Sequence, residues 1–367
     1  MKIDDRGICN ACEAHGLKRE IDWVQREAAF RDVVRRAKSR SEGYDCVIPV
    51  SGGKDSTWQV IQCLEYGLHP LAVTWKTPAR TAVGAKNLEN LISLGVDHID
   101  YQINPEVEKK LLYLALVRHG ATAIPMHLGV YNIPRNIALH FNIPLVIWGE
   151  NGAFEYGCSD EERQGFVMDS QWIKKHGATH EITALDYLSE GLTEKDLAAY
   201  QAPTDEALKK KGILSIFLGY YFPWDPATSL AAALEHGFQV SEKAKTGYYN
   251  YADIDDDFVS IHHYLKWYKY GFTRLFDNLS LEIRNGRLTR DQAIRIIRER
   301  GDQTPHEDIE KFCRFVGITK SHFFEVIEKF RNPKIWTQRN GTWKLEGFLI
   351  PDWEWDEIQV KGTAPRL

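Results

Sequence analysis

The stretch Asp45-Cys-Val-Ile-Pro-Val-Ser-Gly-Gly-Lys-Asp-Ser-Thr57 decides the fold, because it joins an apolar segment to a polar turn. The apolar residues predict a short strand, and the residues after the glycines predict the start of a helix. Two adjacent glycines let the backbone approach a bulky anion without interference from Cβ atoms. The helix N-terminus adds free N–H groups and a positive dipole end. The stretch therefore predicts a phosphate-binding turn.

The side chains of the turn support the same interpretation. Lys54 supplies a positive charge, and Ser51 and Ser56 supply hydroxyl donors. The spacing differs from the GxxxxGK[ST] pattern, which serves cleavage at the γ-phosphate. An ordinary strand-to-helix turn is the alternative, but two adjacent glycines cost conformational entropy that a turn without a ligand does not require.

Bulk properties limit the classes of protein. A chain of 367 residues is too long for one ordinary core and predicts two domains. The formal net charge of −5 gives no general attraction to nucleic acid. No apolar stretch approaches the roughly 18 residues that cross a bilayer, the N-terminus does not resemble a signal peptide, and six scattered cysteines make no disulfide scaffold. We therefore expect a cytoplasmic protein without a nucleic-acid partner or membrane insertion.

Strand and helix signals alternate from residue 44 onward. Strands are expected at 46–50, 70–75, 98–103, 144–148 and 212–219, and helices at 57–66, 83–94, 111–119 and 130–141. Alternation of this kind is typical of a parallel sheet with helical crossovers. Ligands of such sheets bind at the carboxyl ends of the strands. The phosphate turn lies at one such end, and so do Thr74 and residues 149–151.

From about residue 254 the signals become helical. Thr289-Arg-Asp-Gln292 and Thr304-Pro-His-Glu307 both fit capping boxes, the second with Pro at the first helical position. Gly301 and Gly317 stand where helices should end, and a third helix is expected at 320–330. Asn340-Gly341, between apolar-polar alternations, predicts a β-hairpin.

Several motifs together carry a family resemblance. Ser51-Gly-Gly-Lys-Asp-Ser56 resembles the SGGxDS loop of the PP-loop ATP pyrophosphatases. With the other motifs it resembles the N-acetyl sugar amidotransferases of bacterial surface-polysaccharide, lipopolysaccharide and nonulosonic-acid biosynthesis. Those motifs are Pro144-Leu-Val-Ile-Trp-Gly-Glu-Asn151, Glu155-Tyr-Gly157, Asn87-Leu-Glu-Asn-Leu91 and Arg331-Asn-Pro-Lys-Ile-Trp336. The resemblance runs over nearly the whole chain.

The resemblance implies an α/β fold. It consists of a parallel-sheet PP-loop domain of the adenine nucleotide alpha hydrolase-like kind, a C-terminal helical region and a short terminal β-hairpin. The expected boundaries are 1–42 for an N-terminal cysteine-containing arm and helix, 43–253 for the ATP-binding domain, 254–335 for the helical region and 336–367 for the hairpin tail.

The resemblance also implies a reaction. It is the ATP-dependent replacement of an acetamido oxygen by nitrogen, which yields an acetamidino sugar, AMP and pyrophosphate. The implied partners are an N-acetylated, nucleotide-linked sugar and a separate glutaminase that supplies ammonia, and a homo-oligomer is left open. The main alternative is a PP-loop sulfurtransferase acting on tRNA or a small molecule. The net negative charge of the chain and the lack of a second CxxC motif disfavour it. A non-catalytic nucleotide-binding module is disfavoured because the sequence Ser51-Gly-Gly-Lys-Asp-Ser56 suits the binding of pyrophosphate.

The phosphate turn and the strand ends form the expected nucleotide site. Asp55 is either a Mg²⁺ ligand that bridges the phosphates or a helix cap. Glu150 holds Mg²⁺ or ribose, with a solvated loop carboxylate as the alternative, and Gly149 permits close approach. The residues expected to bind ATP are Ser51, Gly52, Gly53, Lys54, Asp55, Ser56, Val73, Thr74, Gly149 and Glu150; Val73 and Thr74 meet adenine through the backbone or simply pack.

Catalytic roles are expected for Lys54, Asp55, His127 and Glu150. His127 is a candidate general base for the incoming ammonium, with a structural histidine as the alternative. The residues expected to contact the sugar are Asn151, Glu155, Tyr156 and His263. The aromatic runs 220–224 and 248–251 are more typical of core than of sugar platforms.

Cys9 and Cys12 have zinc-knuckle spacing, but two ligands make only half of a zinc site. His15 and Cys158 are the candidates to complete it. A pair of thiols in a flexible arm is the alternative. The expected cofactors are therefore ATP with Mg²⁺, and zinc is left open.

Overall fold

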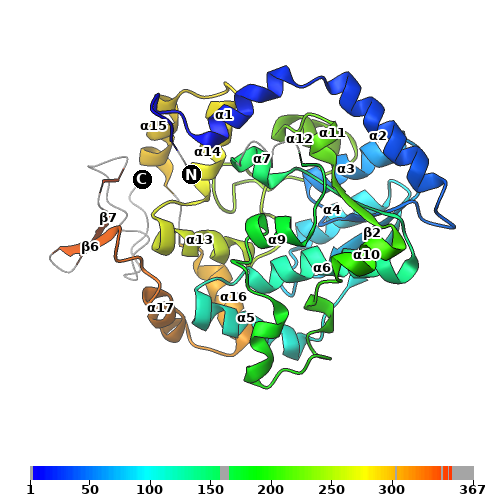
Figure 1. Cartoon of the computed structure of the whole chain (residues 1–367). Helices are drawn as coiled ribbons and strands as arrows, with labels where there is room; N and C mark the ends of the chain where they lie inside the picture. Colours follow the sequence, from blue (N-terminus) through cyan, green and yellow to red (C-terminus); the bar gives the residue numbers. More distant parts are fainter. Residues whose placement is uncertain (1–2, 158–164, 302–303, 340–341, 346, 349–367) are drawn as a thin grey trace. The chain divides into compact units, whose positions relative to one another are not determined.

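The computed structural model describes residues 3–157, 165–301, 304–339, 342–345 and 347–348. Figure 1 shows the chain, with many of its helices and strands labelled. The chain forms two compact units, each assembled from separate segments. The sheet unit comprises Met1–Pro78, Ala82–Val107 and Met126–Gln239, and the helical unit comprises Ala79–Thr81, Glu108–Pro125 and Val240–Leu367.

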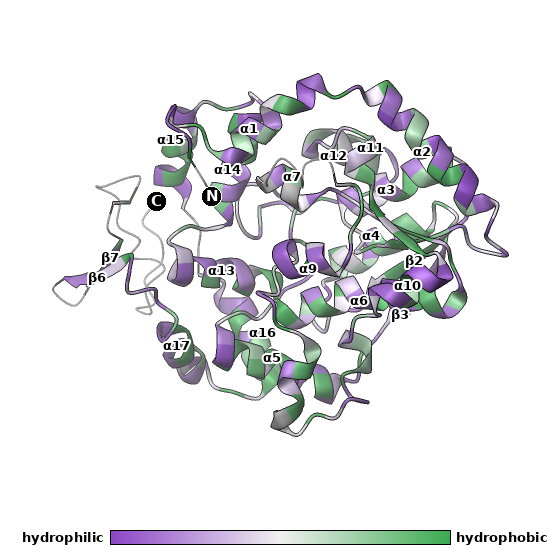
Figure 2. Cartoon of the chain, in the orientation of Figure 1, coloured by the Kyte–Doolittle hydropathy of each residue, from purple (hydrophilic) through white to green (hydrophobic). Residues whose placement is uncertain are grey.

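A five-stranded parallel sheet is the framework of the sheet unit. Its order is β3-β2-β1-β4-β5, which confirms the predicted parallel α/β sheet. The order reverses between β1 and β4, and ligands of open α/β sheets bind at such a point. The strands are β1 (Cys46–Pro49), β2 (Pro70–Trp75), β3 (Asp97–Tyr101), β4 (Leu145–Trp148) and β5 (Leu214–Phe217). Strands β1, β2 and β4 are mostly buried and apolar, as expected for strands covered on both faces. Strand β2 is coloured as hydrophobic in Figure 2, whereas the edge strand β3 is polar and mostly exposed.

Helices connect and flank these strands. In α2 (Trp23–Lys38) the buried residues recur at helical spacing, and the ring of Phe30 packs 5.4 Å from that of Tyr221 and 5.2 Å from that of Phe222. The other helices of the sheet unit are α1 (Asn10–Leu17), α3 (Lys54–Glu65), α4 (Ala82–Ile92), α7 (Gly152–Tyr156), α9 (Ser170–His176), α10 (Asp205–Lys211), α11 (Leu218–Tyr221) and α12 (Pro226–Glu235). Short 3-10 helices lie at Lys18–Glu20, Ala184–Glu190 and Ala198–Tyr200. Of the helices within the described ranges, none combines the length and the apolar character that a membrane span needs.

Two long helices have residues in both units: α5 (Pro105–His119) belongs mostly to the helical unit, and α6 (Ile124–Phe141) mostly to the sheet unit. The helical unit also contains α13 (Val259–Tyr270), α14 (Arg274–Arg284), α15 (Arg290–Arg300), α16 (His306–Val316) and α17 (Lys320–Glu328). The antiparallel strands β6 (Trp336–Arg339) and β7 (Thr342–Leu345) confirm the predicted hairpin. Its predicted turn, Asn340-Gly341, lies outside the described residues.

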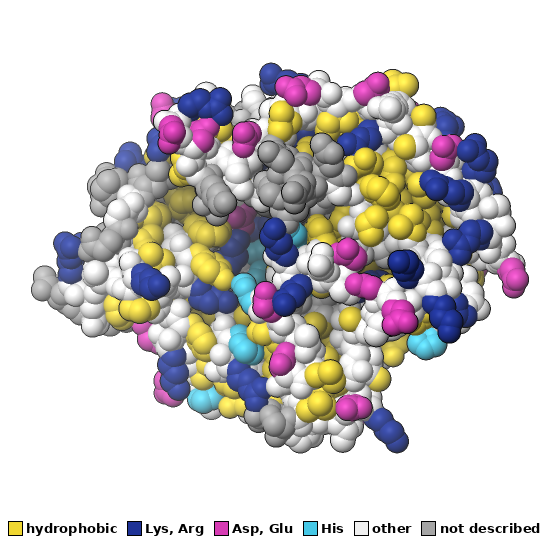
Figure 3. Space-filling view, in the orientation of Figure 1, with side chains coloured by type: hydrophobic (Ala, Val, Ile, Leu, Met, Phe, Trp, Pro, Cys, Tyr) yellow, Lys and Arg dark blue, Asp and Glu magenta, His cyan; other side chains and the backbone are white. Residues whose placement is uncertain are grey.

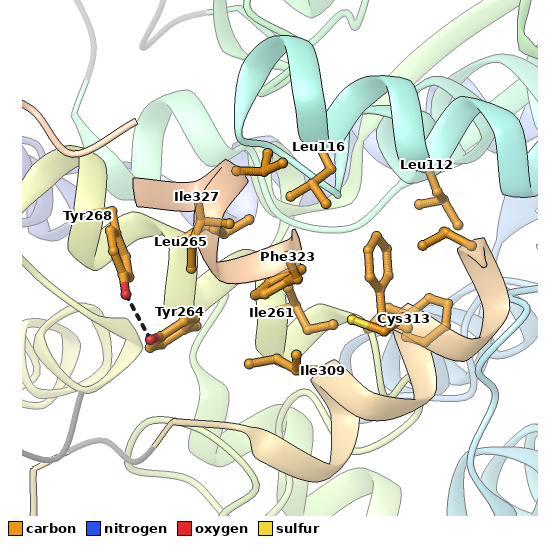
Figure 4. Close-up of a cluster of buried hydrophobic side chains, with 14 of the residues drawn as sticks. Leu112, Leu116, Ile261, Tyr264, Leu265, Tyr268, Ile309, Cys313, Phe323 and Ile327 are labelled. Carbon is orange, nitrogen blue, oxygen red and sulfur yellow. Dashed lines mark hydrogen bonds between the residues drawn. The ribbon is translucent and has the colours of Figure 1, made fainter. Parts of the chain in front are cut away.

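The core of the helical unit joins segments that are far apart in sequence. Leu112 and Leu116 of α5 pack with Ile261 of α13, Cys313 of α16 and Phe323 of α17, all of them buried (Figure 4). The hydroxyl groups of Tyr264 and Tyr268 lie 3.0 Å apart at the edge of this cluster. Because Leu112 and Leu116 belong to the cluster, α5 shares a hydrophobic core with the C-terminal helices.

The helix signals of this unit are confirmed with one exception. Thr289 and Gln292 form the predicted capping box, and Gly301 and Gly317 end α15 and α16. The predicted cap at Thr304 is wrong. Thr304 is buried, and α16 begins at His306 after Pro305, which has no side-chain donor or acceptor to cap the helix.

Thr289→Ala should destabilise the helical unit by about 1 kcal/mol, because it removes the hydroxyl that accepts a 3.2 Å hydrogen bond from the Gln292 backbone N–H. Urea denaturation would measure the loss. Thr289→Ser retains a capping hydroxyl and should restore most of the stability. Equal loss in both variants would contradict the capping role.

Candidate active site

The phosphate turn requires glycine at residue 52. The φ angle of Gly52 is +87°, and a Cβ there would lie 2.6 Å from the backbone nitrogen of Leu88 in α4. The sequence predicts this glycine for the approach of an anion, whereas the structure shows close packing of the turn against α4. Gly53 has an ordinary φ of −70° and precedes the first residue of α3, so the helix N-terminus opens directly after the turn.

Hydroxyl groups hold the turn in shape. The side-chain oxygen of Ser51 accepts a 3.2 Å hydrogen bond from the Gly53 N–H. The hydroxyls of Ser56 and Thr57 each donate to the Gly53 carbonyl at 3.0 Å. Ser51 and Ser56 therefore stabilise the backbone of the turn, and their contact with phosphate stays a prediction.

Lys54 and Asp55 form a charged pair beside the turn. The Lys54 Nζ is buried and lies 2.6 Å from the Asp55 Oδ2. The indole N–H of Trp224 donates to the Asp55 Oδ1 at 3.0 Å, and the Lys54 Nζ lies 5.7 Å from the Trp224 ring centroid. These bonds of Asp55 go to side-chain donors rather than to a backbone N–H of α3. Trp224 is a site residue that sequence reasoning placed only in an aromatic run.

Glu150 follows β4, and its carboxyl group interacts electrostatically with Lys54 and Asp55, which follow β1. Burial, together with the negative charge of Asp55, raises the pKa of its carboxyl group to about 7, and the Lys54 ammonium opposes this shift. The Gly219 N–H donates to the Gly149 carbonyl at 3.0 Å, and a Cβ on Gly219 would lie 3.2 Å from the Cα of Glu150. The absence of a side chain at Gly219 thus lets α11 pack against the loop that carries Glu150.

Glu150→Gln should make the protein more stable at high pH, by at most about 2 kcal/mol. The folded-state pKa of Glu150 is raised from 4.5 to about 7, so its stabilising contribution is present below about pH 4.5 and is lost as the pH rises through 7. The glutamine variant avoids that loss. Urea denaturation at pH 5 and pH 8 should show a gain that grows with pH, whereas the exposed control Glu206→Gln should show none. A gain of equal size at both pH values would contradict the assignment.

The donor set of the site suits Mg²⁺ with ATP and does not suit zinc. Asp55 and Glu150 are two hard carboxylates, and Mg²⁺ bound to phosphates commonly uses one or two protein carboxylates. In the described part of the chain, no group of three or more His, Cys, Asp or Glu side chains could hold a metal ion by itself. The Sγ atoms of Cys9 and Cys12 lie 3.4 Å apart, so the pair remains half of a zinc site and zinc is not supported. Cys158 lies outside the described residues.

Val73 and Thr74 lie at the end of β2, where both side chains are buried. The Val73 carbonyl accepts a 2.9 Å hydrogen bond from the Val50 N–H. The Thr74 hydroxyl lies 2.8 Å from the His98 Nε2. The Val73 carbonyl and the Thr74 hydroxyl thus have protein partners, and the backbone contact with adenine stays a prediction.

Asn151 and Glu155 are buried beside this loop. The Asn151 amide donates to the Gly165 carbonyl at 3.3 Å. The carboxylate of Glu155 accepts hydrogen bonds of 2.6 and 2.7 Å from Lys18, which follows α1. Glu155 therefore ties α7 to the N-terminal arm. The side chain of Tyr156 lies outside the described residues, and the sugar contacts of Asn151, Glu155 and Tyr156 stay predictions.

A cavity of about 590 Å³ opens next to Glu150 within the sheet unit. Its walls include Tyr131 from α6, Trp148 and Glu150 from the end of β4, and Trp172 from α9. His127 stacks on Tyr131 with ring centroids 6.0 Å apart, one helical turn from the cavity wall. Sequence reasoning missed the contribution of α9, whose only signal is an aromatic residue followed by Lys174-Lys175-His176.

His263 belongs to the helical unit. Its ring is buried, with the Nε2 3.5 Å from the Asp253 carboxylate. Burial lowers the pKa of His263, and the Asp253 charge opposes that shift. Arg274 donates to Asp253 at 2.8 Å. The structure thus gives His263 a charged neighbourhood within its own unit, and its sugar contact stays a prediction.

The strand order, with the Ser51–Ser56 turn at the β1–β4 switch point, defines an α/β protein with an open parallel sheet. Residues 244–348 match the sequence model described as "LPS biosynthesis protein WbpG-like, C-terminal domain". The C-terminal part of the chain is thus similar to a domain described for lipopolysaccharide biosynthesis.

Comparisons with solved structures give distant matches. An NMN synthetase from Francisella tularensis is 15% identical, with 52% of this chain and 92% of that chain covered and a TM-score of 0.26. An NAD+ synthetase from Burkholderia pseudomallei is 14% identical, with 64% and 95% covered and a TM-score of 0.24. These scores are too low to carry an argument, so the fold rests on the strand order and the turn. No curated protein matches the sequence.

Proposed function

We propose that this protein is an ATP-dependent amidotransferase acting on an N-acetylated, nucleotide-linked sugar. The observation that carries the proposal is the joining of Lys54, Asp55 and Glu150 at the β1–β4 switch point, directly beside a cavity that can take a second substrate. The WbpG-like C-terminal domain supports a sugar of lipopolysaccharide or other surface-polysaccharide biosynthesis, including nonulosonic acids.

The proposed reaction has two steps. The acetamido oxygen attacks the α-phosphate of ATP, a P–O bond forms, and pyrophosphate leaves. Ammonia then attacks the acetamido carbon, and the C–O bond breaks so that AMP leaves with the former acetamido oxygen. The nitrogen gives up a proton as the acetamidino group forms, and His127 is the proposed base.

In this proposal the turn and Lys54 hold the departing pyrophosphate. N–H donors at the start of α3 point at a fixed position and need no rearrangement as charge develops. Mg²⁺, held by Asp55 and Glu150, would neutralise phosphate charge. Ser51, Gly52, Gly53 and Ser56 form the rest of the phosphate site, and Val73, Thr74 and Gly149 approach the nucleoside.

We further propose a cytoplasmic location, where ATP is available, and a separate glutaminase as the source of ammonia. In the sulfurtransferase alternative, a reactive cysteine would act near the nucleotide. Cys46 and Cys63, next to the turn in sequence, are fully buried, and burial raises the pKa of the Cys46 thiol. On the face shown in Figure 3, basic and acidic side chains are intermingled, which does not favour an extended RNA-binding surface there.

The test is incubation with ATP, ammonium and a panel of nucleotide-linked acetamido sugars. We expect AMP, pyrophosphate and a sugar in which oxygen is replaced by NH, as seen by mass spectrometry. With a sugar carrying ¹⁸O in its acetamido group, the label should appear in AMP. The same sugars without the acetyl group are the control. Formation of ADP and phosphate, or retention of the label in the sugar, would overturn the proposal.

A further inference from the structure

Trp224 reaches the phosphate turn from a distant part of the chain. It lies between α11 and α12 and is 8% exposed, and its indole N–H donates to the Asp55 Oδ1 at 3.0 Å. The Lys54 ammonium donates to the other oxygen of the same carboxylate, Oδ2, at 2.6 Å. Asp55 thus has one neutral donor and one positively charged donor, on different oxygens.

The position of Trp224 is fixed by the helix that follows it. The carboxylate of Asp225 caps α12 by accepting 3.2 Å hydrogen bonds from the backbone N–H groups of Ala227 and Thr228. Helix α12 packs along α3, in which Asp55 is the second residue. The donor and the acceptor of the indole hydrogen bond therefore lie at the starts of two helices that pack together. A donor anchored in this way can restrict the Asp55 carboxylate to one orientation.

The indole N–H differs from the Lys54 ammonium in its effect on Asp55. It is only a donor and carries no charge, so it fixes the position of Oδ1 without neutralising the carboxylate. The Asp55 side chain is 36% exposed and stays accessible. Its oxygens also have lone pairs for more than one partner. Asp55 can therefore accept the indole hydrogen bond and bind a cation at the same time.

We infer that Trp224 is a positioning residue of the nucleotide site, which holds the Asp55 carboxylate in place for Mg²⁺ while Lys54 serves the phosphates. The inference rests on the proposed function for the presence of ATP and Mg²⁺ at the turn. The phosphates and Asp55 are rival acceptors for the Lys54 ammonium, and the Trp224 N–H is the donor that stays with Asp55. Loss of a group that orients a metal-binding carboxylate typically lowers metal affinity by about 10–100-fold.

The first test compares the original protein with Trp224→Phe, which keeps an aromatic ring but lacks the N–H. Calorimetry measures the binding of a non-hydrolysable ATP analogue over a series of Mg²⁺ concentrations and in EDTA. The Mg²⁺ concentration that gives half of the full effect should rise about tenfold or more in the variant. Affinity for the analogue in EDTA should stay within about twofold, because the turn and Lys54 remain. Trp23→Phe, at the first residue of α2, is the matched control and should change neither value.

The second test asks whether Trp224 acts through Asp55. In an Asp55→Asn background, Trp224→Phe should cause little further change in the dependence on Mg²⁺, because the charge that the indole positions is already gone. A residue that only packs would cause the same loss in both backgrounds. That result would overturn the inference, and so would an unchanged dependence on Mg²⁺ in Trp224→Phe or an equal loss of affinity in EDTA.

The outcomes also separate this inference from the proposed function. A normal dependence on Mg²⁺ in Trp224→Phe, with AMP formed on an acetamido sugar by the original protein, would refute the role of Trp224 alone. The expected shift without AMP formation on any sugar would refute the proposed reaction and leave the role of Trp224 standing. Binding of the analogue by the original protein without any effect of Mg²⁺ would overturn the inference as well.

Discussion

Lys54→Ala is expected to lower the rate of AMP formation by about 10²–10³-fold or more. The ammonium group is buried beside the N-terminus of α3 and pairs with Asp55 at 2.6 Å. Its removal leaves the negative charges of Asp55 and Glu150 opposite an incoming triphosphate without the nearest positive charge. The measurement is the rate of pyrophosphate release with saturating sugar and ammonium.

Two further variants separate chemistry from folding. Lys54→Met keeps most of the buried stem but not the charge, so it should lose activity as fully as the alanine variant while circular dichroism and urea denaturation remain near the original values. Lys86→Ala removes a lysine from α4 whose side chain is 51% exposed, and activity should be retained. Full turnover by Lys54→Met would remove Lys54 from the mechanism.

Gly52→Ala is expected to be the most damaging small substitution in the turn, costing about 2–5 kcal/mol of stability. The alanine would have to adopt a φ of +87°, and its Cβ would lie 2.6 Å from the Leu88 nitrogen and 2.8 Å from the Leu88 Cα. Because both contacts are with backbone, α4 or the turn must move. ATP affinity should fall with stability, and both can be followed by calorimetry and urea denaturation.

Gly53→Ala is the matched comparison. Residue 53 has a φ of −70°, and a Cβ there would meet only the Ser51 side-chain oxygen, at 3.2 Å. A serine side chain can shift by a few tenths of an ångström, so this variant should fold nearly normally. If both alanine variants were equally stable, the packing argument for Gly52 would be wrong.

Most of the sheet could be predicted from the sequence because its central strands are short apolar runs followed by a glycine or a polar turn. Cys46–Pro49, Pro70–Trp75 and Leu145–Trp148 are buried along most of their length, whereas the edge strand Asp97–Tyr101 is polar and mostly exposed. Helices flanked by clear caps, such as α15, were predicted equally well. The cap predicted at Thr304 is wrong because a sequence pattern does not show that the capping side chain is buried.

The contacts that shape the site could not be predicted, since they join distant residues. The bond between Trp224 and Asp55 spans 169 positions, and that between Lys18 and Glu155 spans 137. Nothing in the local sequence of either partner identifies the other. Likewise, nothing in the sequence around Lys174 and Lys175 indicates that they line the cavity beside Trp172.

The discontinuous build of the helical unit limits how the protein can be divided. A fragment that started at residue 244, where the WbpG-like match begins, would lack Leu112 and Leu116, and the apolar faces of Phe323 and Ile261 that they cover would meet water. Such a fragment should aggregate, and adding back residues 108–125 as a separate peptide should improve its solubility. On the ribosome, α5 is made more than a hundred residues before α13 and its later partners, so this helix must wait with its apolar face uncovered until the C-terminal helices emerge.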